Sequence, residues 1–157
     1  MRCPRCQLTP PLSPPCCPGC GFRRPAITPP PLDGRLCDHA SLLDQAERAR
    51  LAAALPPSTL ALTLPVAAPL APAELAFALF DHWRPGGDQG SGLLVLLALA
   101  ERRIELMVGT AWETRLPAAE LAHLLADRTA PLLARGQWAD GLWTTLDGLR
   151  TLLAAAP

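Results

Sequence analysis

The sequence of 157 residues contains no lysine, no tyrosine and no asparagine. Without lysine the chain has neither Schiff-base chemistry nor a P-loop of the G-x-x-x-x-G-K type. Long apolar runs are also missing, because the longest, Leu93 to Ala100, is far short of the roughly 20 residues that a membrane span requires. The opening Met-Arg-Cys-Pro-Arg-Cys has no apolar stretch typical of a secretory signal. We therefore expect a cytoplasmic protein without a membrane span.

Charge is sparse. Only 18% of the residues are charged, and 14 basic side chains balance 14 acidic ones. Arginine exceeds acid before residue 36, but no concentrated basic face follows from this spacing, so nucleic-acid binding is not expected. His39, His82 and His123 are far apart, and no serine occupies a G-x-S-x-G motif. A hydrolase triad therefore has no support from the sequence.

The first 36 residues differ in composition from the rest of the chain. Residues 1–36 hold five of the six cysteines and more than half of the nineteen prolines, which cannot build a hydrophobic core. We assign residues 1–21 to a cysteine-rich unit. Residues 22–35, with their Pro29-Pro30-Pro31 run, read as a semi-rigid polyproline linker. The apolar periodicity lies entirely beyond this linker, so residues 36–157 are expected to fold without the cysteine-rich unit.

Two C-x-x-C pairs stand in the cysteine-rich unit, Cys3 with Cys6 and Cys17 with Cys20. Each spacing brings two thiolates from one tight turn to the same ion, and two such turns complete a tetrahedral zinc ribbon. Disulfides or a redox pair are the alternatives, which the expected cytoplasmic setting and the absence of a thioredoxin-like strand disfavour. A closed four-cysteine site is structural, because no coordination position remains for water or substrate.

The other two cysteines have less defined roles. Cys16 is next to the site and is a candidate spare ligand, whereas Cys37 reads as a small buried residue.

From residue 36 onward helical and strand patterns alternate, which indicates an α/β domain. Asp44 and Glu47 predict a capping box, and Pro72 predicts a helix start. Residues 93–99 read as a central buried strand, and alternation around residues 103–108 predicts a half-exposed partner joined to it by a hairpin. A helix is expected from residue 117, bent or broken at Pro131, and a last helix carries Leu142, Leu146, Leu149 and Leu153 on one face.

Four acidic residues stand in or next to predicted loops: Asp38, Asp88, Glu113 and Asp140. Carboxylates that converge from several loops suit a hard cation such as calcium or magnesium. The hairpin would return the loops of Asp88 and Glu113 to one end of the sheet. Each acid also has a simpler reading as a surface charge or a helix cap.

Three stretches carry a family resemblance: residues 37–55, residues 80–116 and residues 130–149. The middle one joins a Gly-rich loop with Asp88 and Gly92 to a buried strand, an alternating strand, Gly109 and Glu113. Over about residues 36–154 the chain resembles the TPM domain, an α/β sandwich, and zinc-ribbon versions of that domain share its layout. The resemblance implies divalent-cation binding and, in one branch of the family, acid phosphatase activity.

Two functions are consistent with these observations. In the first, the chain is a non-catalytic adaptor, with the zinc ribbon as a knuckle for a protein partner. In the second, it is a low-activity, metal-dependent phosphatase. The first is favoured, because the sequence assembles neither a nucleophile with a base nor two metals with a phosphate cradle.

Overall fold

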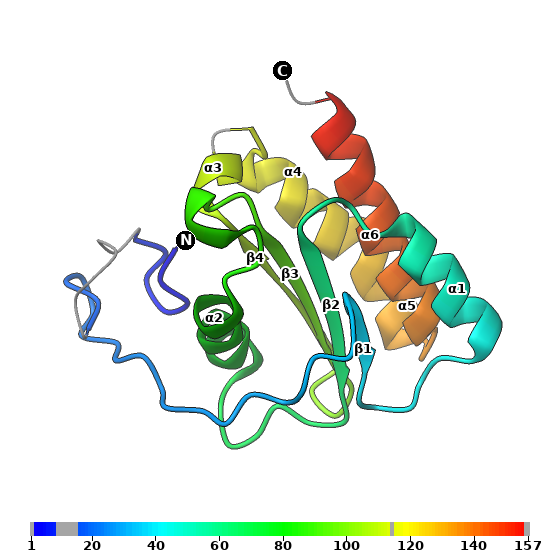
Figure 1. Ribbon diagram of the computed structural model, residues 1–157, viewed down its shortest axis with the longest axis horizontal. Coiled ribbons are helices and arrows are strands. Elements are labelled where there is room, and N and C mark those ends of the chain that lie inside the picture. Colours follow the sequence, from blue (N-terminus) through cyan, green and yellow to red (C-terminus); the bar gives the residue numbers. More distant parts are fainter. Residues whose placement is uncertain (1, 9–15, 114, 156–157) are drawn as a thin grey trace.

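The computed structural model describes residues 2–8, 16–113 and 115–155. A four-stranded sheet in the order β1-β2-β3-β4 forms the central layer of an α/β sandwich (Figure 1). The first three strands are mutually parallel, and the last is antiparallel to its neighbour. The strands are β1 (Leu36–Asp38), β2 (Thr59–Leu64), β3 (Leu93–Ala98) and β4 (Arg103–Val108).

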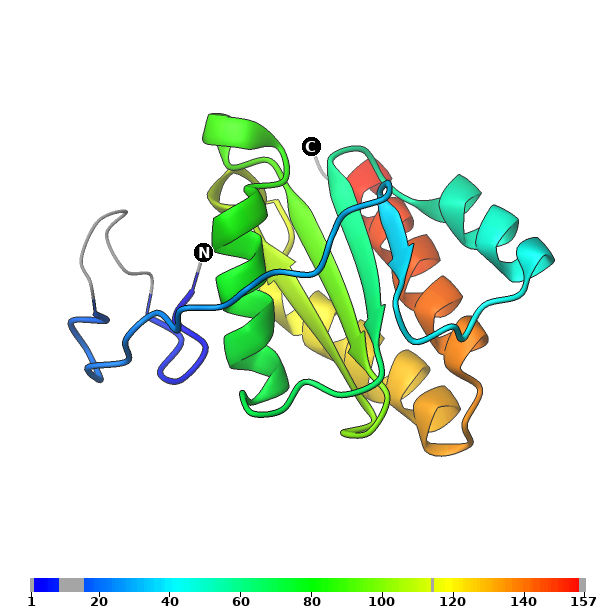
Figure 2. The ribbon, with the colours of Figure 1, turned by 60° about the horizontal axis from the view of Figure 1, so that its bottom comes forward.

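Helices cover both faces of the sheet (Figure 2). On one face lies α2 (Pro72–Trp83), and on the other α1 (Gln45–Ala54) packs beside the last helix, α6 (Trp138–Ala155). Shorter segments complete the chain: η1 (Gly87–Gln89), α3 (Thr110–Glu113), α4 (Ala118–His123), the π-helical turn η2 (Leu124–Thr129) and α5 (Ala130–Ala134). In the described part of the chain, no helix is both long and apolar enough to cross a membrane.

Alternating side chains build a core on each face of the sheet. Ala61 and Val95 point toward α1 and α6, whereas Leu62 and Leu96 point toward α2. All six residues of β3 are fully buried, which confirms the predicted central strand. The alternation in β4 places Leu106 with the first core and Met107 with the second.

The parallel strands have crossovers of opposite hand. The chain steps from β1 to β2 and on to β3 in one direction across the sheet, yet α1 and α2 lie on opposite faces. One of the two connections is therefore left-handed, which is rare.

Local signals in the sequence fix several helix ends. The capping box is present, because the Asp44 carboxylate accepts from the Glu47 N–H at 2.7 Å while Glu47 accepts from the Asp44 N–H at 2.9 Å. Pro72 begins α2 as predicted. Of the two predicted effects of Pro131, a break is wrong: η2 continues directly into α5, and the wider π-helical turn just before Pro131 accommodates its missing N–H.

Candidate metal centre and adjoining groove

The four cysteines of the two C-x-x-C pairs converge. Their Sγ atoms all lie within 4.8 Å of one another, with Cys3 and Cys20 3.7 Å apart and Cys6 and Cys17 3.4 Å apart. A disulfide would bring two sulfurs to about 2 Å. Four sulfurs at about 2.3 Å from a tetrahedral zinc would be about 3.8 Å apart. The cluster can therefore hold one metal ion such as zinc, and it fits a zinc ribbon.

The two loops that carry the sulfurs are built alike. In the first, the N–H of Cys3 donates to the Leu8 carbonyl at 2.6 Å, and the N–H of Gln7 donates to the Cys3 carbonyl at 3.0 Å. The second loop repeats both hydrogen bonds at the corresponding residues, Cys17, Gly21 and Phe22. The repeated bonds hold both cysteine pairs in matching turns, so that each turn presents its two sulfurs on one side.

Gln7 takes the place of the usual glycine in the first loop. Its φ is 63°, close to the 70° of Gly21 at the matching position. The left-handed conformation is natural for glycine and costs a residue with a Cβ about 1 kcal/mol. The first loop therefore has the same turn geometry as the second, but it is locally strained at Gln7.

The thiols are electrostatically interdependent. The pKa of Cys17 is lowered to about 7, chiefly by the backbone N–H of Gly19, although burial acts in the opposite direction. The N–H of Leu8 favours the Cys6 thiolate, but burial and the neighbouring sulfurs outweigh it and raise the pKa of Cys6 to about 12. Four thiolates at this separation repel one another, and a bound cation removes that repulsion.

The metal loops pack on the α/β domain. Phe22 and Phe77 of α2 meet edge to face with ring centroids 5.7 Å apart, and Cys3 and Cys17 complete this buried cluster. Arg5 pairs with Glu74 of α2 at 2.7 Å. Phe22, the first residue of the predicted linker, is thus part of a core rather than of an exposed spacer.

Cys16 and Cys37 lie outside the cluster. Cys16 forms an isolated β-bridge with Arg23, and it is not a member of the four-sulfur group. Cys37 is buried in β1, as its reading as a small core residue predicted, and its thiol donates to the Gly34 carbonyl at 3.4 Å.

Asp38 has a structural role in place of the predicted cation-binding one. Its fully buried carboxylate accepts hydrogen bonds from the N–H groups of Leu42 and Leu43, at 3.1 and 2.9 Å, and from the Thr63 hydroxyl. Arg48 lies 3.1 Å away. Burial alone would raise the pKa of Asp38, but these donors outweigh it and hold the pKa below its ordinary value. The Asp38 carboxylate therefore links the end of β1 to α1 and β2.

Asp38 and Asp140, the further candidates for a cation site at the loops of Asp88 and Glu113, lie away from those loops. Asp38 ends β1 and pairs through Thr63 with Leu97, near the end of β3, whereas Asp88 precedes β3. The two acids therefore lie at opposite ends of the sheet. Asp140 is exposed and faces Arg50 at 3.4 Å. Among the described residues, the cysteines form the only group of three or more side chains close enough to hold a metal.

The loops of Asp88 and Glu113 do meet, as the hairpin predicted. The Ala111 N–H donates to the Gly90 carbonyl at 3.1 Å, and a Cβ on Gly109 would lie only 2.0 Å from that oxygen. The Asp88 side chain, however, is 97% exposed and lies 3.6 Å from Arg84. Glu113 instead lines a groove along β4.

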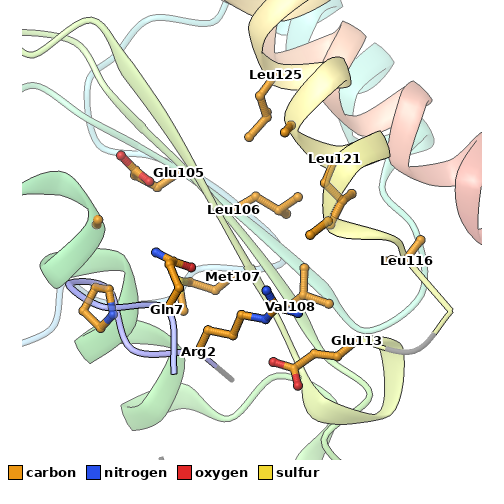
Figure 3. Close-up of a pocket in the computed structure, with 14 residues that line it drawn as sticks. Arg2, Gln7, Glu105, Leu106, Met107, Val108, Glu113, Leu116, Leu121 and Leu125 are labelled. Atoms are coloured by element: carbon orange, nitrogen blue, oxygen red, sulfur yellow. The ribbon is translucent and has the colours of Figure 1, made fainter. Parts of the chain in front are cut away.

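This groove, which the sequence did not reveal, is a cavity of about 300 Å³ between the first metal loop and α4 (Figure 3). Four consecutive residues of β4, from Glu105 to Val108, line it. Because neighbouring strand residues point to opposite faces, a cavity that touches all four opens at the edge of the sheet. Its walls are Arg2, Pro4, Gln7 and Ala73 on one side and Glu113, Leu116, Ala118, Leu121, Ala122 and Leu125 on the other.

The fold and the site together define the class of protein: an α/β sandwich with a four-cysteine centre ahead of its first strand. The model of the TPM domain matches residues 36–152, so the chain belongs to the TPM domain family. No curated protein matches it.

Two solved structures share the fold. The N-terminal domain of a P. gingivalis protein is 26% identical, covers 76% of this chain and 82% of its own, and has a TM-score of 0.65. The N-terminal domain of the Corynebacterium glutamicum protein cg2496 is 17% identical, with coverage of 87% and 88% and a TM-score of 0.61, a likeness of fold alone.

Proposed function

We propose that this protein is a non-catalytic adaptor module in which one structural zinc, held by Cys3, Cys6, Cys17 and Cys20, fixes the N-terminal loops against the TPM domain. The supporting observation is the position of the four sulfurs, which lie within 4.8 Å of one another and share a buried cluster with Phe22 and Phe77. A metal at this place organises a surface made jointly by the ribbon and the domain. It leaves no coordination position for a substrate.

The alternative, a metal-dependent phosphatase, requires a metal that can contact the substrate. The acids that the hairpin topology suggests for this task are Asp88 and Glu113. Asp88 extends into solvent beside Arg84, and Glu113 belongs to the wall of the groove. Among the described residues no third ligand joins these two acids, because the four cysteines are the only group of three or more metal-binding side chains, and this favours the adaptor function.

Hydrolysis of a generic phosphomonoester separates the two functions. With zinc, magnesium or calcium present, we expect the purified full chain to hydrolyse the ester only at the background rate. The Asp88→Asn, Glu113→Gln double variant should show the same rate. NMR spectra of the full chain should likewise show no saturable shifts at residues 88 or 113 during a calcium titration. Metal-dependent turnover that is lost in the double variant would contradict the adaptor function and establish the phosphatase.

A further inference from the structure

The free edge of β4 is the floor of the groove. β4 is the last strand of the sheet, so only one of its edges pairs with β3. The Gly109 N–H donates to the Gly92 carbonyl of the same ladder at 2.9 Å. Along an antiparallel strand, the backbone N–H and C=O groups of successive residues point alternately to the two edges. Counting back from Gly109, those of Met107, Glu105 and Arg103 therefore also point toward β3. Ile104, Leu106 and Val108 therefore direct their N–H and C=O groups outward.

These outward groups have no partner in another segment of the described chain. An edge strand with free hydrogen-bonding groups is a template for one more strand, and proteins normally cover or distort such an edge. Here the edge lies between two walls, with the metal loop on one side and α4 on the other (Figure 3). A segment that adds to β4 must therefore enter between these two walls.

The side chains around the edge of β4 indicate which side chains a bound peptide would have. Leu106, Leu121 and Leu125 form an apolar wall on the α4 side. Glu105 lies on the opposite side, and burial raises its pKa despite Arg103 at 3.6 Å. Glu105 is the only charged side chain among the four β4 residues that line the groove, and 20% of it is exposed, so a basic side chain of a ligand can reach it.

We propose that the groove binds an extended peptide segment by strand addition to β4, with apolar side chains at alternate positions and a lysine or arginine opposite Glu105. The backbone of the peptide bonds to Ile104, Leu106 and Val108, while its apolar side chains face the leucines of the α4 wall. If the peptide runs antiparallel to β4, its residue opposite Glu105 forms a non-hydrogen-bonded pair with it, in which side chains approach most closely. This inference rests on the proposed adaptor function, because the metal loop supplies one wall.

The probe is a random heptapeptide library displayed on phage, selected on the zinc-loaded full chain. Peptides that enrich should be lost on Ala122→Trp, in which an indole fills the groove from an exposed position. The matched control is Ala126→Trp, an exposed position one turn further along that does not line the groove. We expect binding to the control to equal that of the wild type.

Synthetic copies of an enriched peptide, N-methylated at one amide at a time, test the binding mode. Strand addition predicts a period of two: methylation of amides that face β4 weakens binding about tenfold, and methylation of those between them has little effect. Charge reversal at Glu105, in Glu105→Arg, should weaken the same peptides and select acidic ones instead. NMR shifts should centre on residues 104–108.

Three outcomes would overturn the inference. They are no enrichment above a selection without protein, equal binding to Ala122→Trp, and N-methyl effects without alternation. A concentration-dependent dimer that Ala122→Trp abolishes would show that a second copy occupies the edge, which also overturns it. Zinc content is measured on the same samples: one zinc per chain without peptide binding refutes only the inference, whereas a chain that takes up no zinc refutes the adaptor proposal itself.

Discussion

Removal of the metal should destabilise the TPM domain, although the domain supplies none of the ligands. Without zinc the two cysteine loops lose the ion that holds them together and are expected to unfold. Phe22 then leaves Phe77, which is only 4% exposed in the intact structure. The α/β domain should remain folded, because its two cores on the sheet do not depend on the ribbon.

The expected size follows from this contact. Full burial of a phenylalanine side chain contributes about 1.5–3 kcal/mol, and the ribbon covers part of Phe77, so about 1–2 kcal/mol is lost. The edge-to-face contact adds about 0.5–1.5 kcal/mol. The exposed Arg5 in its pair with Glu74 adds little. A loss of about 2–3 kcal/mol lowers the melting temperature of a domain this size by roughly 5–10 °C.

Tryptophan fluorescence is the appropriate assay. All four tryptophans lie between residues 83 and 143, so the signal reports the α/β domain and not the ribbon. Thermal unfolding is followed with zinc bound and after chelation in reductant. Phe77→Leu should reduce the metal-dependent shift, whereas Phe80→Leu, which changes a buried phenylalanine away from the ribbon, should preserve it. Identical melting with and without metal in the wild type would refute the reasoning.

Two further predictions concern single side chains. Asp38→Asn should lower the free energy of unfolding at pH 7 by about 2–3 kcal/mol, because charge-assisted hydrogen bonds at the end of β1 are weakened. Since the folded pKa of Asp38 is below its ordinary value of about 3.9, its contribution is present above that pH and is lost as the pH falls through the folded pKa. Urea unfolding at pH 7 and pH 3 should therefore show a smaller pH dependence in Asp38→Asn, and an equal loss in both proteins would disprove this role. Gln7→Gly should relieve the left-handed strain of the first metal loop and tighten zinc binding by about 2–5-fold in a competition titration, whereas Gly21→Ala should weaken it. An unchanged affinity in both variants would show that these two positions carry no strain.

Features with local causes could be predicted from the sequence. The capping box of Asp44 and Glu47 needs only residues three apart, and the buried run of β3 needs no knowledge of its neighbours. The C-x-x-C spacing likewise fixes two sulfurs within one turn. Only the meeting of the two turns is a tertiary event, and four cysteines in one short segment already indicate it.

The acids illustrate what could not be predicted. Asp38 ends a strand of only three residues, too short for a periodic signal, and its position at the far end of the sheet follows from the register of β1 on β2. The groove depends on strand order, because β4 is open only as the last strand. The half-exposed alternation of β4 was visible in the sequence, but nothing local to it indicates that the first metal loop lies alongside.

The zinc content of the purified chain tests the central claim most directly. Elemental analysis by mass spectrometry should find one zinc per wild-type chain and none in the Cys3→Ser, Cys20→Ser double variant. The matched control, Cys16→Ser with Cys37→Ser, removes two cysteines outside the four-sulfur group and should keep one zinc. Equal zinc in both double variants, or disulfide bonds in place of metal in the wild type, would contradict the account.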